Sequence, residues 1–267
     1  RRQRQMCIRD SLRSVYGSPN NVGLYLGRAL PVAISVALLG GNRNRRMSYI
    51  GAAILMAIAL VLSFSRGALL LGVPAALTVI ILCRGGKRAT ATLLSLLAAA
   101  TAALLAFGRH PRLASLLSHT AGPTFFRINL WQSTLNMIRD NPLTGVGLDN
   151  FLYAYRGRYI APPAWQDPHL SHAHNWVLDF AARIGLPGLA VILWLLVAFF
   201  GTAARALRTL SEPGLRALAV GLVASMVDFL AHGMVDASYW FVDLAFAFML
   251  TVALTQRLAN WKDPDLS

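Results

Sequence analysis

Seven long apolar runs, separated by polar links, restrict the fold of this sequence more than any other feature. They cover residues 22–40, 47–64, 67–83, 90–107, 177–203, 215–232 and 240–256. The hydrocarbon core of a bilayer is about 30 Å thick, so a helix needs roughly 20 apolar residues to cross it. Only 13% of the residues are charged, against about 25% in a soluble domain. The runs therefore predict an all-α, polytopic integral membrane protein with about seven transmembrane helices in a lipid bilayer.

The basic residues between the runs indicate an orientation. Four links (41–46, 84–88, 205–216 and 256–262) hold 11 of the 25 lysines and arginines. The positive-inside rule assigns such links to the cytoplasm. The turn at 65–66, the segment 108–176 and the turn at 232–239 must then face outward, and seven spans alternate consistently with that scheme. The net charge of +14 is scattered over these links rather than gathered on one polar face, so we expect no nucleic-acid partner.

The chain divides at the long outward segment. Residues 14–107 hold the first four predicted spans, residues 108–176 form an extracytoplasmic loop that carries site residues, and residues 177–256 hold the last three spans. Residues 257–267 form a cytoplasmic tail. Residues 1–13 lack an apolar segment and a helical period, so we interpret them as an artefact or a truncated start and exclude them from fold reasoning. We expect the chain to be the C-terminal portion of a longer protein.

The extracytoplasmic loop is predicted to be partly helical. In "RINLWQSTLNMIRDN" (127–141) apolar residues recur at helical spacing, and "NPLTGVG" (141–147) ends the helix with proline and glycine. "HPRLASLLSHT" (110–120) is typical of a short amphipathic helix lying at the membrane interface. Long loops are usually functional, so we expect this segment to contain part of a site.

Three arginines lie within or beside the predicted spans, on the outward side. Arg66 lies between two apolar runs, Arg28 lies about two turns inside its helix on a face with Tyr25, and Arg127 begins the loop helix. Such charges cost at least ~2.5–3.5 kcal/mol at mid-bilayer and by default mark function. The alternative interpretation is that these arginines extend to the lipid headgroups and form no site. Because no carboxylate cluster matches them, these arginines suit an anionic ligand, and guanidinium pairs bidentately with the oxygens of a diphosphate.

The stretch "PHLSHAHNW" (168–176) holds three histidines, His169, His172 and His174. Imidazole is both the commonest metal ligand and the commonest proton-transfer group near neutral pH. A zinc site commonly adds cysteine or carboxylate ligands, and nothing in the sequence fixes the geometry of the nearby aspartates. We therefore predict no metal here. For His169 and His172 solvated loop positions are the favoured interpretation, with contact to an acceptor as the alternative.

Four segments carry a resemblance to a known family. They are "SPNNVGLYLGRALP" (18–31), "SRGALL" (65–70), "RINLWQSTLNMIRDNPLTGVGLDNF" (127–151) and "HNWVLDFAARIGLPG" (174–188). In this order they resemble the O-antigen ligase and polymerase superfamily, bacterial membrane glycosyltransferases that use polyprenyl-diphosphate-linked glycans. The last segment matches the family's ligase signature of His-Asn, nine residues, Gly, two residues and Gly, formed here by His174, Asn175, Gly185 and Gly188. The resemblance covers residues 14–256.

The resemblance implies an activity and a division of roles. Arg66 and Arg127 would bind the lipid-linked diphosphate, and His174 would be the essential histidine, acting as the general base on the acceptor hydroxyl. We group five further residues as substrate-binding candidates: Arg28, Asn175, His172, His232 and Asp236. The implied reaction inverts the anomeric carbon and needs neither a metal nor another cofactor. It would take place at the outer face of the bacterial cytoplasmic membrane.

Two alternatives stay open at this point. The acceptor is a glycan, lipid A-core or a protein, and no feature of the sequence chooses among them. A polytopic transporter of polysaccharide or lipid-linked glycan without transferase activity also fits apolar helices with arginines among them, and it favours interrupted helices and charges at mid-membrane. Asp228 is the charged residue inside a predicted span, where helix packing explains it at least as well as a role in a site.

Overall fold

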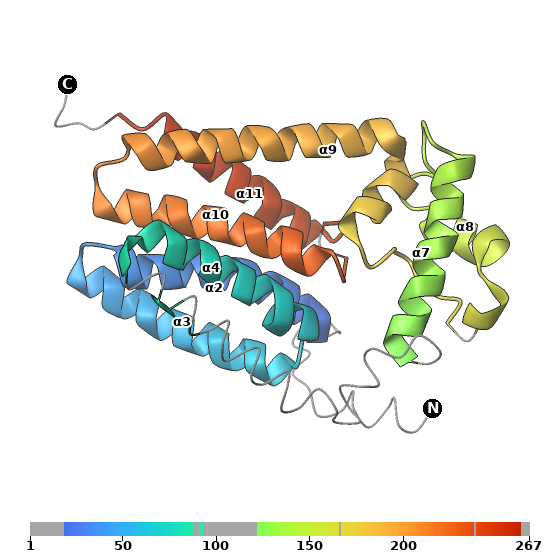
Figure 1. Cartoon of the computed structure of the whole chain (residues 1–267), viewed down its shortest axis with the longest axis horizontal. Helices are drawn as coiled ribbons and strands as arrows, with labels where there is room; N and C mark the ends of the chain where they lie inside the picture. The colour runs from blue at the N-terminus through green and yellow to red at the C-terminus, as the bar shows by residue number, and fades with distance from the viewer. Residues whose placement is uncertain are drawn as a thin grey trace. The chain divides into compact units, whose positions relative to one another are not determined.

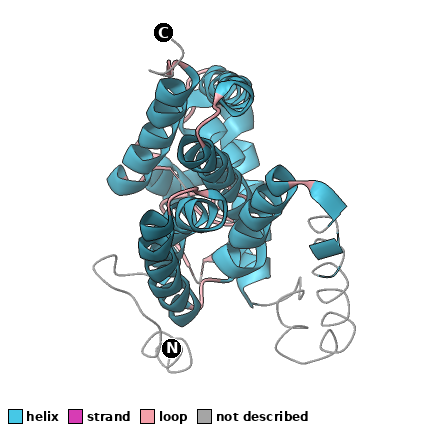
Figure 2. Ribbon diagram, turned by 90° about the vertical axis from the view of Figure 1, so that its left-hand side faces the viewer, coloured by secondary structure: helices cyan, strands magenta, loops and turns pink. Residues whose placement is uncertain are grey.

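The structure is a computed structural model that describes residues 19–87, 91, 92, 95, 122–165, 167–237 and 239–262. Every regular element among these residues is a helix, and none of them forms a strand (Figures 1 and 2). The predicted all-α class is confirmed. The chain falls into two compact units, which are described separately: unit 1 comprises residues 1–85 and 196–267, and unit 2 comprises residues 86–195.

Five helices are long and apolar enough to cross a membrane. They are α2 (Pro19–Leu39), α3 (Arg43–Ser63), α9 (Trp176–Thr209), α10 (Pro213–Gly233) and α11 (Val242–Ala259). Each coincides with a predicted run to within a few residues, apart from the C-terminal end of α9, which extends beyond residue 203. The five helices establish a multi-pass membrane protein.

The other two predicted spans have different outcomes. The run 67–83 is helical but shorter than the five spans, and it begins with a π-helical turn, η2 (Ala68–Gly72), that continues into α4 (Val73–Arg84). Only residues 91, 92 and 95 of the run 90–107 belong to the described part of the chain. The interfacial helix predicted at 110–120 lies outside the described residues, so the total of seven spans stays a prediction.

Unit 1 is a helical bundle in which α10 packs against α2, α4 and α11 (Figure 1). Close approach depends on small residues, as in other membrane bundles: a Cβ added to Gly221 of α10 would lie 2.7 Å from Cα of Val32 on α2. The C-terminal part of α9 contributes Ala206 and Leu210 to a cluster with α10 and α11. The helices of unit 1 are therefore closely packed, and most of the side chains buried between them are apolar.

The basic links of unit 1 meet at one end of its bundle. A cavity of 320 Å³ there is lined by the ends of three links: Leu39, Cys83, Arg84, Ser211, Pro213, Arg216, Ala217 and Val220. Local capping fixes these ends, since Asn42 accepts a hydrogen bond from the backbone of Arg45 and Glu212 caps α10 ahead of Pro213. The meeting of these links at one end is what the alternation of spans predicts.

Unit 2 contains the predicted loop helix and the short elements that follow it. Its helices are α7 (Gly122–Asp140), α8 (Phe151–Ala154), η3 (Tyr155–Tyr159), η4 (Pro162–Ala164) and α9 as far as Leu195. The helix predicted at 127–141 is confirmed as α7, which begins at Gly122. A core of Leu130, Met137, Phe151, Tyr155, Ala173 and Ala182 joins these elements. The described part of the segment predicted to face outward therefore has a hydrophobic core.

Candidate functional site

His174 lies in a loop that runs directly into the N-terminus of α9. Its φ of 51° places it in the left-handed region, where the only other non-glycine residue among those described is Phe64. Such a backbone conformation is uncommon for a residue with a side chain and persists only where its surroundings fix it. The Asn175 side chain accepts a hydrogen bond from the backbone N–H of Leu178 at 3.1 Å, as an N-cap residue does. Asn175 therefore starts the helix while His174 is partly exposed just before it.

Ala173, the residue before His174, is held by hydrogen bonds to both its N–H and its carbonyl. The backbone N–H of Ala173 donates to Oδ1 of Asp179 at 3.1 Å. The Ala173 carbonyl accepts a hydrogen bond from the indole Nε1 of Trp131 on α7 at 3.0 Å. Ala173 itself is fully buried in the core of unit 2. These contacts fix the direction in which the chain enters His174.

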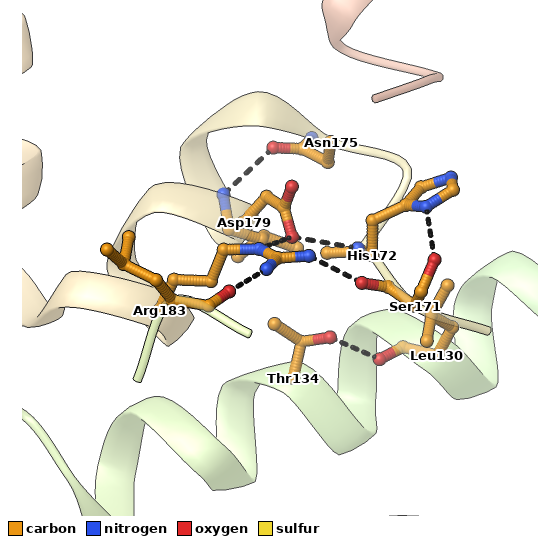
Figure 3. Close-up of polar contacts among 10 residues, drawn as sticks. Leu130, Thr134, Ser171, His172, Asn175, Asp179 and Arg183 are labelled. Carbon is orange, nitrogen blue, oxygen red and sulfur yellow. Dashed lines mark hydrogen bonds and ion pairs between the residues drawn. The ribbon is translucent and has the colours of Figure 1, made fainter. Parts of the chain in front are cut away.

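A buried ion pair joins this loop to α9. Arg183 Nε lies 3.2 Å from Asp179 Oδ1, one helical turn away, and the two residues are only 7% and 1% exposed. The Arg183 guanidinium also donates to the backbone carbonyl of Ser171 (Figure 3). It donates to the Leu148 carbonyl as well and lies over the Phe151 ring. Charge-assisted hydrogen bonds of this kind are the strong ones. Arg183 thus ties two loop segments to the start of α9.

The glycines of the sequence signature have a structural explanation. Gly185 interrupts α9 with a φ of 75°, and a Cβ there would lie 2.3 Å from the Leu143 carbonyl oxygen. The Leu186 N–H donates to the Pro142 carbonyl at 2.7 Å. A Cβ on Gly188 would lie 2.3 Å from the Ile184 side chain. Glycine is thus needed for the backbone angle and for the close approach of the 142–147 turn, and two segments of the resemblance form one substructure.

The three histidines of the loop lie in different environments. The rings of His172 and His174 are 4.2 Å apart in an edge-to-face arrangement. Ser171 Oγ and His172 Nδ1 are 3.2 Å apart, within hydrogen-bonding distance (Figure 3). His169 is exposed. The loop therefore brings two of the three imidazoles together.

Arg127 lies on α7 one turn before Trp131. Residues four apart share a helix face, so Arg127 lies on the side of α7 that contacts the histidine loop. It is partly exposed, and within the described part of the chain its guanidinium makes no hydrogen bond or ion pair. Its charge is not neutralised by a carboxylate of the described residues, which is what an anion-binding arginine requires.

Arg66 of unit 1 has a similar environment. It is exposed and follows the buried Ser65 in the turn between α3 and η2, and it has no hydrogen bond or ion pair among the residues described. The adjacent Gly67 abuts α10 closely, since a Cβ there would lie 2.4 Å from the His232 ring. Arg66 and His232 therefore lie at the same end of unit 1, away from its basic links.

Arg28 differs from the other two candidate arginines because it lies inside the bundle. It is 5% exposed, donates to the Leu244 carbonyl and lies 5.0 Å from the centroid of the Phe229 ring. Its charge also interacts with Asp228 and Asp243. Tyr25, which the sequence assigned to the same helix face, lies one turn before Arg28 on α2 and is 40% exposed.

The remaining candidates of unit 1 are buried near the end of α10. His232 is fully enclosed, and Asp236 is buried with its carboxylate accepting the N–H of Ala237 at 2.9 Å. Asp228, one turn before His232, is 1% exposed, and a Cβ on Gly72 would lie 2.2 Å from its Oδ1. The side chains of His232 and Asp228 occupy space that Gly67, just before η2, and Gly72, at its end, leave open.

Sequence reasoning missed Asp179 and Arg183. The signal was present, because a charged pair four residues apart stands in the first turns of a predicted span, and charges in spans mark function by default. What the sequence did not indicate is that both side chains turn toward the loop backbone. Tyr155 lies in the core of unit 2, where burial and then the charge of Asp167 raise the pKa of its phenol.

Comparison with known proteins agrees with the signature. The family model described as O-antigen ligase matches residues 51–193, more than half of the chain. The match includes the turn of Arg66, helix α7 and the signature that begins at His174. A search of curated proteins finds no match.

Proposed function

The chain belongs to the O-antigen ligase family, and on that premise we propose that it is a glycosyltransferase with a polyprenyl-diphosphate-linked glycan as donor. The acceptor is a glycan, lipid A-core or a protein. The reaction takes place on the extracytoplasmic side of the bacterial cytoplasmic membrane. The observation that carries the proposal is the fixed His174 loop, whose histidine has an uncommon backbone angle and a buried network holding the preceding peptide.

The chemistry assigns His174 the role of general base. The acceptor hydroxyl attacks the anomeric carbon, its proton passes to His174, and the bond between that carbon and the diphosphate oxygen breaks. Polyprenyl diphosphate leaves with the electron pair of the broken bond. General-base assistance of this kind contributes typically ~10²–10⁴-fold. Because attack and departure occur on opposite faces, the product has the inverted configuration.

Arg66 and Arg127 are proposed to bind the diphosphate. Negative charge grows on the leaving oxygens, and fixed cations stabilise it without reorganising. Both arginines are partly or fully exposed and lack a carboxylate partner among the described residues, which leaves their guanidinium groups available for an anion. Arginines in this role make a metal-independent reaction feasible, and we propose no cofactor. Asn175, His172, His232, Asp236 and Arg28 remain proposed substrate-binding residues, with Arg28 the most enclosed by protein.

The test is transfer by the complete protein in membrane vesicles supplied with a polyprenyl-diphosphate oligosaccharide. A longer glycan still on polyprenyl diphosphate identifies a polymerase, and glycan on lipid A-core or on a protein identifies a ligase. The proposal expects one of these products. Movement of the lipid-linked glycan across the bilayer with no transfer would overturn it in favour of a transporter.

A further inference from the structure

The carboxylate of Asp179 is placed to act on His174 as well as on the loop. Its Oδ1 accepts both of its hydrogen bonds, from the Ala173 N–H and from Arg183 Nε. Its Oδ2 is buried and accepts no hydrogen bond from any residue the structure describes. The carboxylate also interacts electrostatically with His174. One oxygen therefore holds the backbone, and the charge of the group acts on the imidazole.

We propose that Asp179 is a positioning residue for His174, fixing the loop that presents the imidazole and stabilising the imidazolium formed when that ring takes a proton. This rests on the proposed function. The backbone contact acts through Ala173, whose N–H donates a hydrogen bond to the carboxylate and whose carbonyl accepts one from Trp131. A carboxylate that holds and stabilises an imidazolium is a known device in general-base catalysis.

Arg183 favours the ionised form of the carboxylate and holds it in place. An isolated carboxylate in a buried site becomes protonated rather than remain charged, and the guanidinium 3.2 Å from Oδ1 opposes that. Arg183 is held in turn by the Ser171 and Leu148 carbonyls and by the Phe151 ring. The pair is thus anchored on the His174 loop at Ser171 and on a separate turn at Leu148.

The hydrogen-bond pattern allows a substitution that removes the charge and little else. In Asp179→Asn the amide oxygen replaces Oδ1 and keeps both hydrogen bonds, while the amide nitrogen replaces Oδ2, which bonds to no described residue. In the complete protein we expect kcat for glycan transfer to fall on the order of 10²-fold with KM little changed. The matched control is Asp140→Asn, which removes an aspartate charge paired with Arg158 at the surface of the same unit; its kcat should be that of the wild type.

A second variant guards against loss of folded protein. Asp179→Asn leaves the Arg183 charge without its counter-ion, so the double variant Asp179→Asn with Arg183→Gln is measured beside it. Rates are taken per molecule that elutes as a single species in detergent. The proposal expects a reduced kcat in both. It is overturned if either variant has a wild-type kcat per folded molecule, or if the loss follows the amount of folded protein alone.

The same assay separates this inference from the proposed function. If His174→Ala has no transfer activity while Asp179→Asn is unimpaired, His174 remains the base and only the positioning role fails. If His174→Ala transfers glycan normally, the proposed mechanism itself fails.

Discussion

Each unit buries an arginine close to an aspartate, and the two arrangements differ in where the hydrogen bonds go. In unit 2, Asp179 and Arg183 bond to each other, to backbone groups of the His174 loop and to the carbonyl of Leu148. In unit 1, neither carboxylate oxygen of Asp228 accepts a hydrogen bond from any described residue. Asp228 instead packs against glycines of α2 and η2, and its charge interacts with Arg28.

The difference indicates two tasks for similar residues. An ion pair that is hydrogen-bonded to loop backbone holds an irregular segment in place, because the peptide groups of such a segment have no helical partners and need others. A pair enclosed between helices whose peptide groups are already bonded stabilises a packing arrangement. We therefore expect substitutions around His174 to change the catalytic rate, and substitutions around Asp228 to change the stability of the bundle.

The largest expected effect is at the proposed base. His174→Ala in the complete protein should lower glycan transfer on the order of 10²–10⁴-fold and leave expression in the membrane unchanged, measured by product formation and by immunoblot. His169→Ala is the control, because that exposed histidine lies in the same loop. Equal losses of transfer in the two variants would mean that activity depends on the loop as a whole and not on the imidazole of His174.

The two arginines without carboxylate partners should come next. Arg66→Ala and Arg127→Ala remove proposed diphosphate contacts, so each should reduce transfer on the order of 10²–10³-fold without loss of expression. Arg43→Ala and Arg156→Ala remove exposed arginines of the same two units and should have little effect. Full activity of Arg66→Ala or Arg127→Ala would remove that residue from the mechanism.

Asp228→Asn tests the other half of the comparison. Removing one partner of a buried pair costs about 3–5 kcal/mol, so the variant should unfold at a lower temperature in detergent, as followed by circular dichroism. Its kcat per folded molecule should stay near that of the wild type. A raised KM with unchanged stability would instead favour direct contact between the Arg28 region and the substrate.

A smaller effect is expected at the interruption of α9. Gly185→Ala forces a side chain into a left-handed conformation against the Leu143 carbonyl, at a cost of about 1–3 kcal/mol. Thermal unfolding should report this loss. Gly157→Ala is the control, since a Cβ at Gly157 meets nothing within 4 Å. If both variants unfold at the same temperature, the close approach of the 142–147 turn is not a constraint.

Metal removal should have the smallest effect. The rings of His172 and His174 lie close enough to make a metal worth testing, but the proposed reaction relies on arginines. We expect chelator treatment followed by metal-free buffer to leave transfer unchanged. Loss of activity that zinc or magnesium restores would contradict the metal-independent reaction.

The sequence alone determined that the chain forms membrane-spanning helices, and it located the signature that begins at His174. Apolar run length fixes which segments can cross a bilayer, because every peptide group there must be bonded within the helix, and this identified all five described spans. Glycine and proline positions likewise ended α7 near residue 141. The signature by itself separated His174 from His169 and His172.

Only the tertiary structure decided what the buried charges contact. In the sequence, Asp179 and Arg183 belong to a predicted apolar span. The sequence does not show that α9 is interrupted at Gly185, or that the backbone carbonyls of two loops accept hydrogen bonds from Arg183 near the start of this helix. The sequence grouped Arg28 and Arg66 together as candidates for binding an anion, yet one is enclosed and the other exposed. Hydrogen-bond partners far apart in the chain depend on how elements pack, and periodicity within one element carries no information about them.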